Sequence, residues 1–585
     1  MSELFQSFVP LHNPMGFGAA DFIELELAVL VVLLLLAYAG ASKCAQKLAA
    51  HTGWSMLLLA ILPVALRVAM VSQSPAPSPA GSDDFAHLLV ADTLRHLRLA
   101  NPAHPMHRFF ETIFVLQEPS YSSIFPIGQG LALALGSAIL GHPWAGVLLS
   151  VAVLCALCYW MLRAWTTPGW ALVGGLLCVI QFGPLRYWMN TYWGGAVSAV
   201  AGCLVFGSLP RLRASARVRD ALLLGLGLGI QLLARPFEFL LLLAAVILFF
   251  PPPLAGPRDW RKLARLTVAA VLMLLPAAGL ALLQNKQVTG SWTTLPYMLS
   301  RYQYGVPAAF TIHPNPAPHR ELTANQRLDY EAQAAVHGPD TDSPAAYLQR
   351  LGGRVRFYRF FFLAPLYLAV LFFLPALREW RFAWVALTLL LLALGTNFYP
   401  YFYPHYIAAA TCLFVLISVV GLAQLSRIRT EAAQLIVLLC AVHFIFWYGF
   451  HLFADRNAAT TVLQYETWDF VNHGDPQGRI AVRDRLAQAP GKQLVFVRYW
   501  PQHTFGEWVR NAADIDRAAV VWALDLGPTE DEVLRHYYPD RTAWLLEPDA
   551  RPPKLEPYQP EPPAPPVQKE KPSPEQNGIQ LLPIE

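Results

Sequence analysis

Apolar runs of roughly 15 to 22 residues recur along most of the chain, and they limit the possible fold more than any other feature. A helix of about 20 apolar residues crosses the hydrocarbon core of a bilayer. Only 14% of the 585 residues are charged, whereas a soluble protein has about a quarter. The sequence therefore predicts an all-α polytopic membrane domain over 1–453. The apolar runs lie at 22–42, 54–72, 126–141, 144–165, 168–184, 193–209, 221–235, 237–252, 266–283, 357–377, 383–399, 406–424 and 433–452.

The basic residues between these runs indicate how the chain is oriented, because cytoplasmic loops of membrane proteins are rich in Lys and Arg. We expect loops 73–125 and 284–355, and everything after residue 453, to lie on the opposite, outer side. The segments expected at the cytoplasmic face are 43–47, 211–219, 258–265, 378–381 and 427–429.

This alternation is consistent only if one apolar run does not cross the membrane. The short, Gly-rich run 126–141 is the first candidate for a short or re-entrant helix, and 168–184 is the second. The consistent total is then about twelve crossings, with both termini outside.

The composition changes after residue 453, where short strand-like runs at 493–499, 518–526 and 542–547 replace the long apolar runs. Helical patterns at 504–513 and 528–538 alternate with these strands. The alternation predicts a small α/β domain over 454–548. The tail over 549–585 is rich in Pro and charged residues, so we expect it to be disordered.

Two adjacent carboxylates, Asp83 and Asp84, stand near the beginning of loop 73–125, ahead of an expected helix over 84–98. The apolar stripe of that helix favours a position in the plane of the membrane interface. One interpretation makes the pair a general base with an electrostatic or metal-binding partner. The other makes them ordinary acids of a first helical turn, which the helix dipole favours.

Further candidates lie at the ends of apolar runs. Tyr121 follows Glu118, and Tyr192 lies in the aromatic segment 187–195. Both can contact a sugar or a lipid head group, or can belong to the aromatic belt of the membrane interface. Arg235 lies with Glu238 between two apolar runs, where the two charges either pair with each other or hold a phosphate.

The second outer loop and the segment 399–406 supply the remaining candidates. Lys286 and Arg301 are cations just outside a span, with Tyr304 close by in the sequence. They can bind a lipid phosphate or remain solvated. His405, between two spans, can hydrogen-bond a phosphate, ligate a metal or be satisfied locally.

Several function classes are disfavoured by what the sequence lacks. It has no P-loop, no G-x-G-x-x-G that begins a helix after a strand, no H-E-x-x-H and no zinc-spaced Cys/His cluster. An ATP-driven machine is therefore not expected, and neither is a nucleic-acid partner. Any energy for a reaction has to come from the substrate itself.

The Asp-Asp pair, the interfacial helix and the Pro-Ile-Gly-Gln-Gly sequence at 126–130 together resemble the GT-C membrane glycosyltransferases. The branch most similar in pattern is that of the bacterial relatives of protein O-mannosyltransferases and aminoarabinose transferases. The resemblance covers roughly 20–450. It implies that Asp83 is the catalytic base and Asp84 its neighbour, where many relatives have Glu.

The resemblance also implies a polyprenyl-phosphate sugar as donor, with the phosphate held by Lys286, Arg301 and His405. It implies transfer to an acceptor hydroxyl at the periplasmic face of a bacterial inner membrane, with inversion at the anomeric carbon. The acceptor (a glycan, a lipid or a protein) and the need for a divalent cation stay open. Two alternatives remain, a transporter or flippase of lipid-linked glycans and a non-catalytic assembly subunit.

Overall fold

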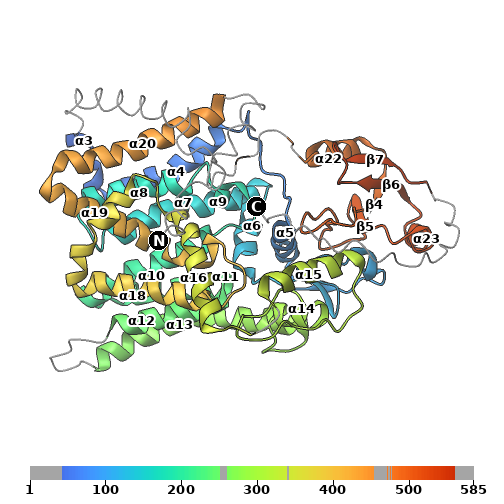
Figure 1. The fold of residues 1–585 in the computed structure, drawn as a ribbon, viewed down its shortest axis with the longest axis horizontal. Helices are drawn as coiled ribbons and strands as arrows, with labels where there is room; N and C mark the ends of the chain where they lie inside the picture. Colours follow the sequence, from blue (N-terminus) through green and yellow to red (C-terminus); the bar gives the residue numbers. More distant parts are fainter. Residues whose placement is uncertain are drawn as a thin grey trace.

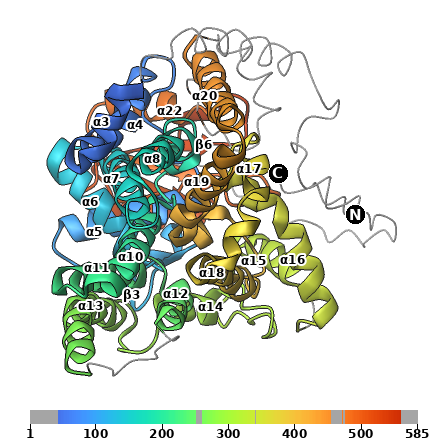
Figure 2. The same cartoon turned by 90° about the vertical axis from the view of Figure 1, so that its left-hand side faces the viewer.

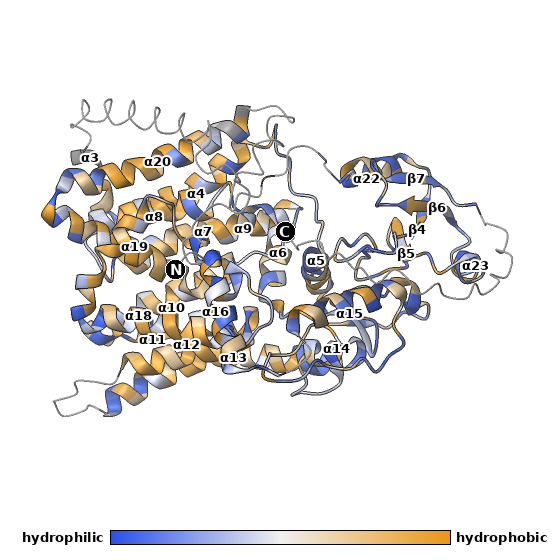
Figure 3. Ribbon diagram, viewed as in Figure 1, coloured by the Kyte–Doolittle hydropathy of each residue, from blue (hydrophilic) through white to orange (hydrophobic). Residues whose placement is uncertain are grey.

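The computed structural model describes residues 42–250, 260–338, 341–453, 471, 475 and 477–559. It is mostly helical, as expected, and has two parts, a helical body and a smaller α/β domain at one end of the body (Figure 1). Apolar residues are concentrated in the body, whereas the α/β domain carries more hydrophilic residues (Figure 3). The first predicted span, 22–42, lies almost entirely outside the described residues.

The body is built from apolar helices that pack around α19, which runs through its centre (Figure 2). Thirteen of the nineteen residues of α7 and thirteen of the eighteen residues of α19 are buried, so these two helices form much of the core. The helices are α3 (Ser42–Ala50), α4 (Thr52–Ala69), α7 (Trp144–Leu162), α8 (Pro168–Phe182), α10 (Ala196–Ser215), α11 (Val218–Ala234), α12 (Pro236–Phe249), α13 (Trp260–Thr289), α17 (Leu366–Leu371), α18 (Trp380–Thr396), α19 (Thr411–Ile428) and α20 (Thr430–Phe453).

Within the described residues, 6 helices are long and apolar enough to cross a membrane. The count reaches 7 if the pair Pro344–Phe361 and Leu366–Arg378, bent by 113°, is one span. Shorter apolar helices such as α8, α12 and α18 account for other predicted runs. The expected total of about twelve crossings is therefore not confirmed.

The short helix α6 (Ile127–Leu140) begins and ends beside the same turn of the chain. Near its start, Gln129 Nε2 donates to the carbonyl of Tyr192 at 2.8 Å. Just past its end, Trp144 Nε1 donates to the carbonyl of Met189 at 2.9 Å. Both ends of α6 are thus tied to the segment 189–192, and α6 is one of the shorter apolar helices; that 126–141 does not cross the membrane stays a prediction.

Helix α5 (Ser82–Arg95) packs along α6 between the body and the α/β domain (Figure 1). The approach is close because Gly130 has no side chain, and a Cβ there would lie 2.2 Å from a methyl carbon of Val90. The α5 helix agrees with the helix predicted over 84–98. The connecting segments add β1 (Asn101–Pro102), η1 (His107–Phe110), β2 (Val115–Leu116), β3 (Ser120–Ser123), α9 (Tyr187–Asn190), α14 (Pro296–Tyr304), α15 (Ala324–His337), α16 (Pro344–Tyr358), η2 (Arg359–Phe361), η3 (Leu374–Arg378) and η4 (Pro404–Ala410).

The α/β domain has a four-stranded sheet in the order β5-β4-β6-β7. The first three strands are parallel, and β7 pairs antiparallel to β6. The three predicted strands and the helix predicted over 528–538 are confirmed. The elements are α22 (Arg479–Gln488), β4 (Lys492–Val497), β5 (Val520–Leu524), α23 (Pro528–Tyr537), β6 (Arg541–Glu547) and β7 (Lys554–Pro557).

Two predictions for this part of the chain were wrong. No helix forms over 504–513, because the N–H groups of Trp508 and Val509 bond to the Glu507 carboxylate instead of to a helical turn. The tail expected to be disordered from 549 onward includes β7, where the buried Leu555 pairs with β6. Besides Leu555, Tyr558 holds this stretch, because its ring packs on Phe496 at 4.7 Å and its hydroxyl donates to Asp531 at 3.0 Å.

Candidate active site

Asp84 fastens the start of α5 to the body. Its carboxylate accepts three backbone N–H bonds, from Tyr192 at 2.8 Å, Ala80 at 3.1 Å and Gly81 at 3.4 Å. Burial raises the pKa of Asp84, and these N–H donors oppose the rise. Because backbone donors occupy both of its oxygens, Asp84 fits a positioning role better than a reactive one.

Asp83 is differently placed, although it is the adjacent residue. Its side chain is half-buried, and no other residue in the described ranges donates a hydrogen bond to its carboxylate. Burial and, to a lesser extent, the charge of Asp84 raise the pKa of Asp83 to about 7, against the opposing effects of the Arg235 charge and a hydrogen bond from the backbone N–H of Asp83 itself. A carboxylate with a pKa near neutrality and free oxygens is suited to general-base chemistry.

Arg235 lies close enough to Asp83 to interact with it electrostatically, in an extended break between α11 and α12. Pro236 begins α12 and disfavours a helical conformation at Arg235, which places this residue at the junction. The Arg235 Nη1 atom lies 3.3 Å from Glu238 Oε1, and its guanidinium lies 4.6 Å from the centre of the Tyr406 ring. The predicted Arg235–Glu238 pair is therefore present, and Arg235 still keeps part of its surface open.

His405 is buried and is held by aromatic neighbours. Its Nδ1 atom lies 3.2 Å from the hydroxyl of Tyr187, and its ring meets Trp193 edge-on at 4.9 Å. Tyr403 stacks on the other side at 5.7 Å and is itself exposed. When the Tyr187 hydroxyl donates to Nδ1, the Nε2 atom carries the ring proton and is available as a donor.

His87 completes the arrangement and was not among the predicted site residues. Its ring stacks on Phe125 at 4.5 Å, and its Nδ1 atom is buried with no partner in the described part of the chain. Burial, together with the charge of Arg235, lowers the pKa of His87 to about 3, so the imidazole is neutral. The sequence feature that points to His87 is its spacing: it follows Asp83 by four residues, so both side chains lie on one face of the helix.

These side chains form one group, here named the Asp83 cluster. The group combines a carboxylate whose pKa lies near 7, one partly exposed arginine, two neutral imidazoles and aromatic rings. Such a set can accept a proton, bind an anion and pack against a sugar ring. Its members are Asp83, His87, Arg235, Glu238, Tyr403, His405 and Tyr406.

Three predicted tyrosines lie elsewhere and hold the surrounding chain. The Tyr192 hydroxyl donates to the carbonyl of Pro77 at 2.8 Å. The Tyr121 hydroxyl donates to the carbonyl of Asn511 in the α/β domain at 3.1 Å. The Tyr304 hydroxyl accepts from Arg320 at 3.3 Å. All three side chains are buried among other residues, which argues against the predicted contacts with a ligand.

The two predicted cations of the second outer loop differ in position. Lys286 is exposed and its Nζ donates to the carbonyl of Gly290 at 2.7 Å, so it caps its own helix away from the Asp83 cluster. Arg301 interacts electrostatically with Tyr399, whose ring lies 5.1 Å from that of Tyr406. Through Tyr399, Arg301 lies near the edge of the Asp83 cluster, and its guanidinium donates to the carbonyls of Pro307 at 3.0 Å and Ala308 at 3.1 Å.

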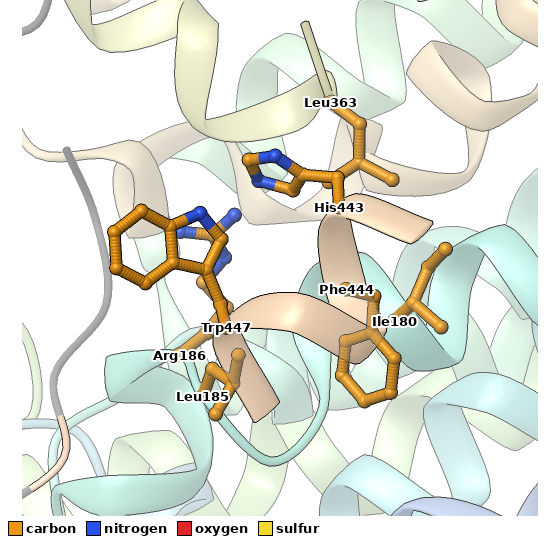
Figure 4. Close-up of a pocket in the computed structure, with 7 residues that line it drawn as sticks. All are labelled: Ile180, Leu185, Arg186, Leu363, His443, Phe444 and Trp447. Carbon is orange, nitrogen blue, oxygen red and sulfur yellow. The ribbon is translucent and has the colours of Figure 1, made fainter. Parts of the chain in front are cut away.

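A small pocket lies apart from the Asp83 cluster, between α8, α9 and α20 (Figure 4). Its lining is mainly apolar, and none of the predicted site residues belongs to it. In the part of the chain that the structure describes, no three or more His, Cys, Asp or Glu side chains are arranged to hold a metal ion. The pocket residues are Ile180, Leu185, Arg186, Leu363, His443, Phe444 and Trp447.

Comparison with known proteins gives matches among solved structures. No family model and no curated protein matches the chain. The apo crystal structure of ArnT from Cupriavidus metallidurans is 12% identical and matches over 85% of this chain and 93% of its own, with a TM-score of 0.47. The same values hold for that protein bound to undecaprenyl phosphate. The apo oligosaccharyltransferase of Archaeoglobus fulgidus is 10% identical and matches over 85% of this chain and 69% of its own, with a TM-score of 0.42. ArnT and the archaeal oligosaccharyltransferase are both GT-C glycosyltransferases.

Proposed function

We propose that this chain is a membrane glycosyltransferase that moves a sugar from a polyprenyl-phosphate donor to an acceptor hydroxyl. The reaction takes place at the periplasmic face of a bacterial inner membrane, with Asp83 as general base. The observation that carries this proposal is the Asp83 carboxylate, which accepts no hydrogen bond from another described residue, has a pKa of about 7 and lies within electrostatic reach of the partly exposed cation Arg235. A proton acceptor beside an anion-binding group is what transfer from a sugar phosphate requires.

In the proposed reaction, Asp83 takes the proton of the acceptor hydroxyl while the hydroxyl oxygen attacks the anomeric carbon. The new glycosidic bond forms as the bond between that carbon and the phosphate oxygen breaks. The bonding electrons leave with the lipid phosphate. Because attack and departure take place on opposite faces of the sugar, the anomeric configuration inverts.

Arg235 is the proposed partner of the departing phosphate. Glu238 orients the Arg235 guanidinium through one nitrogen and leaves the others for phosphate oxygens. His405 adds a neutral N–H donor from Nε2, and Arg301 adds a second cation at the edge of the cluster. The rings of Tyr403 and Tyr406 supply apolar surface for the sugar.

The test of this function uses the purified full chain in lipid bilayers with a panel of polyprenyl-phosphate sugars. Mass spectrometry of the reaction products is expected to show one sugar transferred and free polyprenyl phosphate released. Proton NMR coupling at the anomeric carbon of the product is expected to report inversion. Release of free sugar without transfer to an acceptor, or no consumption of any donor, would count against the proposal.

The pH dependence of the rate follows from the pKa of Asp83. A general base works only when deprotonated, so kcat/KM is expected to rise about tenfold per pH unit below pH 6 and to level off above about pH 7.5. Initial rates between pH 5 and 9 in one lipid composition measure this. A plateau that already begins near pH 5 would show that the essential base has an ordinary carboxyl pKa.

A further inference from the structure

The side of helix α5 that points away from Arg235 faces a second group of charged residues. Asp83 and Phe85 are two residues apart and so point to nearly opposite sides of the helix. The ring of Phe85 is covered by two arginines of the α/β domain. The guanidinium carbon of Arg479 lies 5.6 Å from the ring centre, and that of Arg510 lies 5.3 Å from it.

Arg510 has no counter-ion in the described parts of the chain. Its half-buried guanidinium lies between the rings of Phe85 and Trp522, the latter at 5.4 Å, and makes no hydrogen bond or ion pair with a described residue. The charged groups nearest to it are two further cations, Arg479 and Arg483. Burial, with these two cations, lowers the pKa of Arg510 to about 10, so the guanidinium stays charged at neutral pH.

Arg479 also has donor capacity to spare. Its Nε donates to Gln477 at 2.7 Å and its Nη2 to the carbonyl of Ala80 at 3.1 Å. Its Nη1 atom is buried and has no partner among the described residues. A buried donor without an acceptor is costly, which makes this atom a natural partner for a ligand oxygen.

The acids near Arg479 do not fill this role. Asp84, Asp475 and Glu507 act on Arg479 electrostatically, but their oxygens accept other hydrogen bonds. Those bonds come from backbone N–H groups and, for Glu507, also from the hydroxyl of Tyr499. None of the three acids acts on Arg510.

Two exposed residues near Arg510 and Arg479 add further hydrogen-bond donors. Arg483 is exposed, pairs only with the adjacent Asp484 at 2.9 Å, and is close enough to act on His142 electrostatically. His142 is exposed, and its Nδ1 accepts from the N–H of Trp144 at 3.2 Å. The Nε2 atom of His142 therefore carries the ring proton and can donate to a ligand.

We propose that Arg510, Arg479 and Arg483 form a binding site for a phosphate group between α5 and the α/β domain. Guanidinium groups bind phosphate with charge-assisted, often bidentate hydrogen bonds. A phosphate here supplies the counter-charge that Arg510 lacks and the acceptor that Arg479 Nη1 lacks. The site is separate from the proposed donor site at Arg235, and the phosphate belongs to a lipid head group or to a free phosphate or phosphate ester.

The proposal is tested by phosphate-dependent stability of the full chain, a readout that requires no glycosyl transfer. The melting temperature, followed by tryptophan fluorescence, is measured in zwitterionic detergent with increasing inorganic phosphate at constant ionic strength. A second arm compares lipid nanodiscs that contain phosphatidylglycerol with nanodiscs of phosphatidylcholine alone. A rise in the first arm indicates a free phosphate, and a rise only in the second indicates a lipid head group.

Arg510→Gln is expected to weaken phosphate binding at least about tenfold in the responsive arm. Without phosphate it is expected to melt no lower than the wild type, because an uncompensated charge has been removed. Arg517→Gln is the matched control, since Arg517 is exposed and pairs with Asp514 on the same domain; it is expected to keep the full response.

Two results would overturn the site. One is a wild-type melting temperature that responds to neither inorganic phosphate nor phosphatidylglycerol. The other is an Arg510→Gln variant that keeps the phosphate response and melts lower in its absence, which would make Arg510 a stacking residue only.

Discussion

Replacing Asp83 by Asn is expected to lower kcat by about 10²–10⁴-fold, because the amide cannot take the proton of the acceptor hydroxyl. The substitution conserves size and removes only the charge. It also removes a carboxylate whose raised pKa opposes its ionisation in the folded state. The folded state is therefore expected to be no less stable at pH 8 than that of the wild type. Single-turnover rates with a bound lipid-linked sugar, together with melting curves, measure both effects.

Asp84→Asn is the matched comparison, because Asp84 neighbours Asp83 but bonds to backbone N–H groups. An amide keeps one acceptor oxygen and loses the charge, so this variant is expected to melt earlier while it keeps more activity than Asp83→Asn. If the Asp83→Asn enzyme kept half of the wild-type rate, Asp83 would have no part in the mechanism.

Replacing Arg235 by Gln is expected to lower kcat/KM by about 10²–10³-fold, the effect of removing one donor that stabilises developing charge. Arg235 is the cation that faces Asp83, and its guanidinium has donors beyond the one used by Glu238. The loss is expected to be larger for a donor with a poor leaving group, since such a donor needs more charge stabilisation. Steady-state kinetics with two lipid phosphate donors measure the difference.

The buried Glu238 complicates Arg235→Gln, because the substitution leaves a carboxylate without its partner. The double variant Arg235→Gln/Glu238→Gln removes that problem and is expected to recover stability without recovering activity. Recovery of activity in the double variant would show that Arg235 serves only to neutralise Glu238.

Much of the local structure was predictable because it depends on short stretches of sequence. The strands β4, β5 and β6 follow from compact apolar runs, and α5 follows from an apolar stripe behind two acids. The short helix α6 was also identified, because its length and glycines set it apart from the other runs. The free carboxylate of Asp83 at the start of α5 was therefore foreseen as a candidate.

The partners of Asp83 were less predictable. Arg235 comes close to Asp83, and His405 to Arg235, only through the packing of helices that are far apart in the sequence. Nothing in a single sequence states that Asp84 bonds to Tyr192 whereas Asp83 stays free. The same reason explains why the burial of Tyr121, Tyr192 and Tyr304 was not predictable, since an aromatic residue at the end of a span has the same pattern whether it faces a ligand or a loop.

The contacts between α5 and the α/β domain have a consequence for how the protein is made. Ser82 donates to the carbonyl of Phe505 at 3.1 Å, and the N–H of Ala513 donates to Asp92 at 2.7 Å. The ribosome produces these partners more than four hundred residues after α5. A nascent chain can thus insert its spans before these contacts of α5 with the α/β domain can form. In that interval contacts with the helical body hold α5, among them the hydrogen bond from the Tyr192 N–H to Asp84.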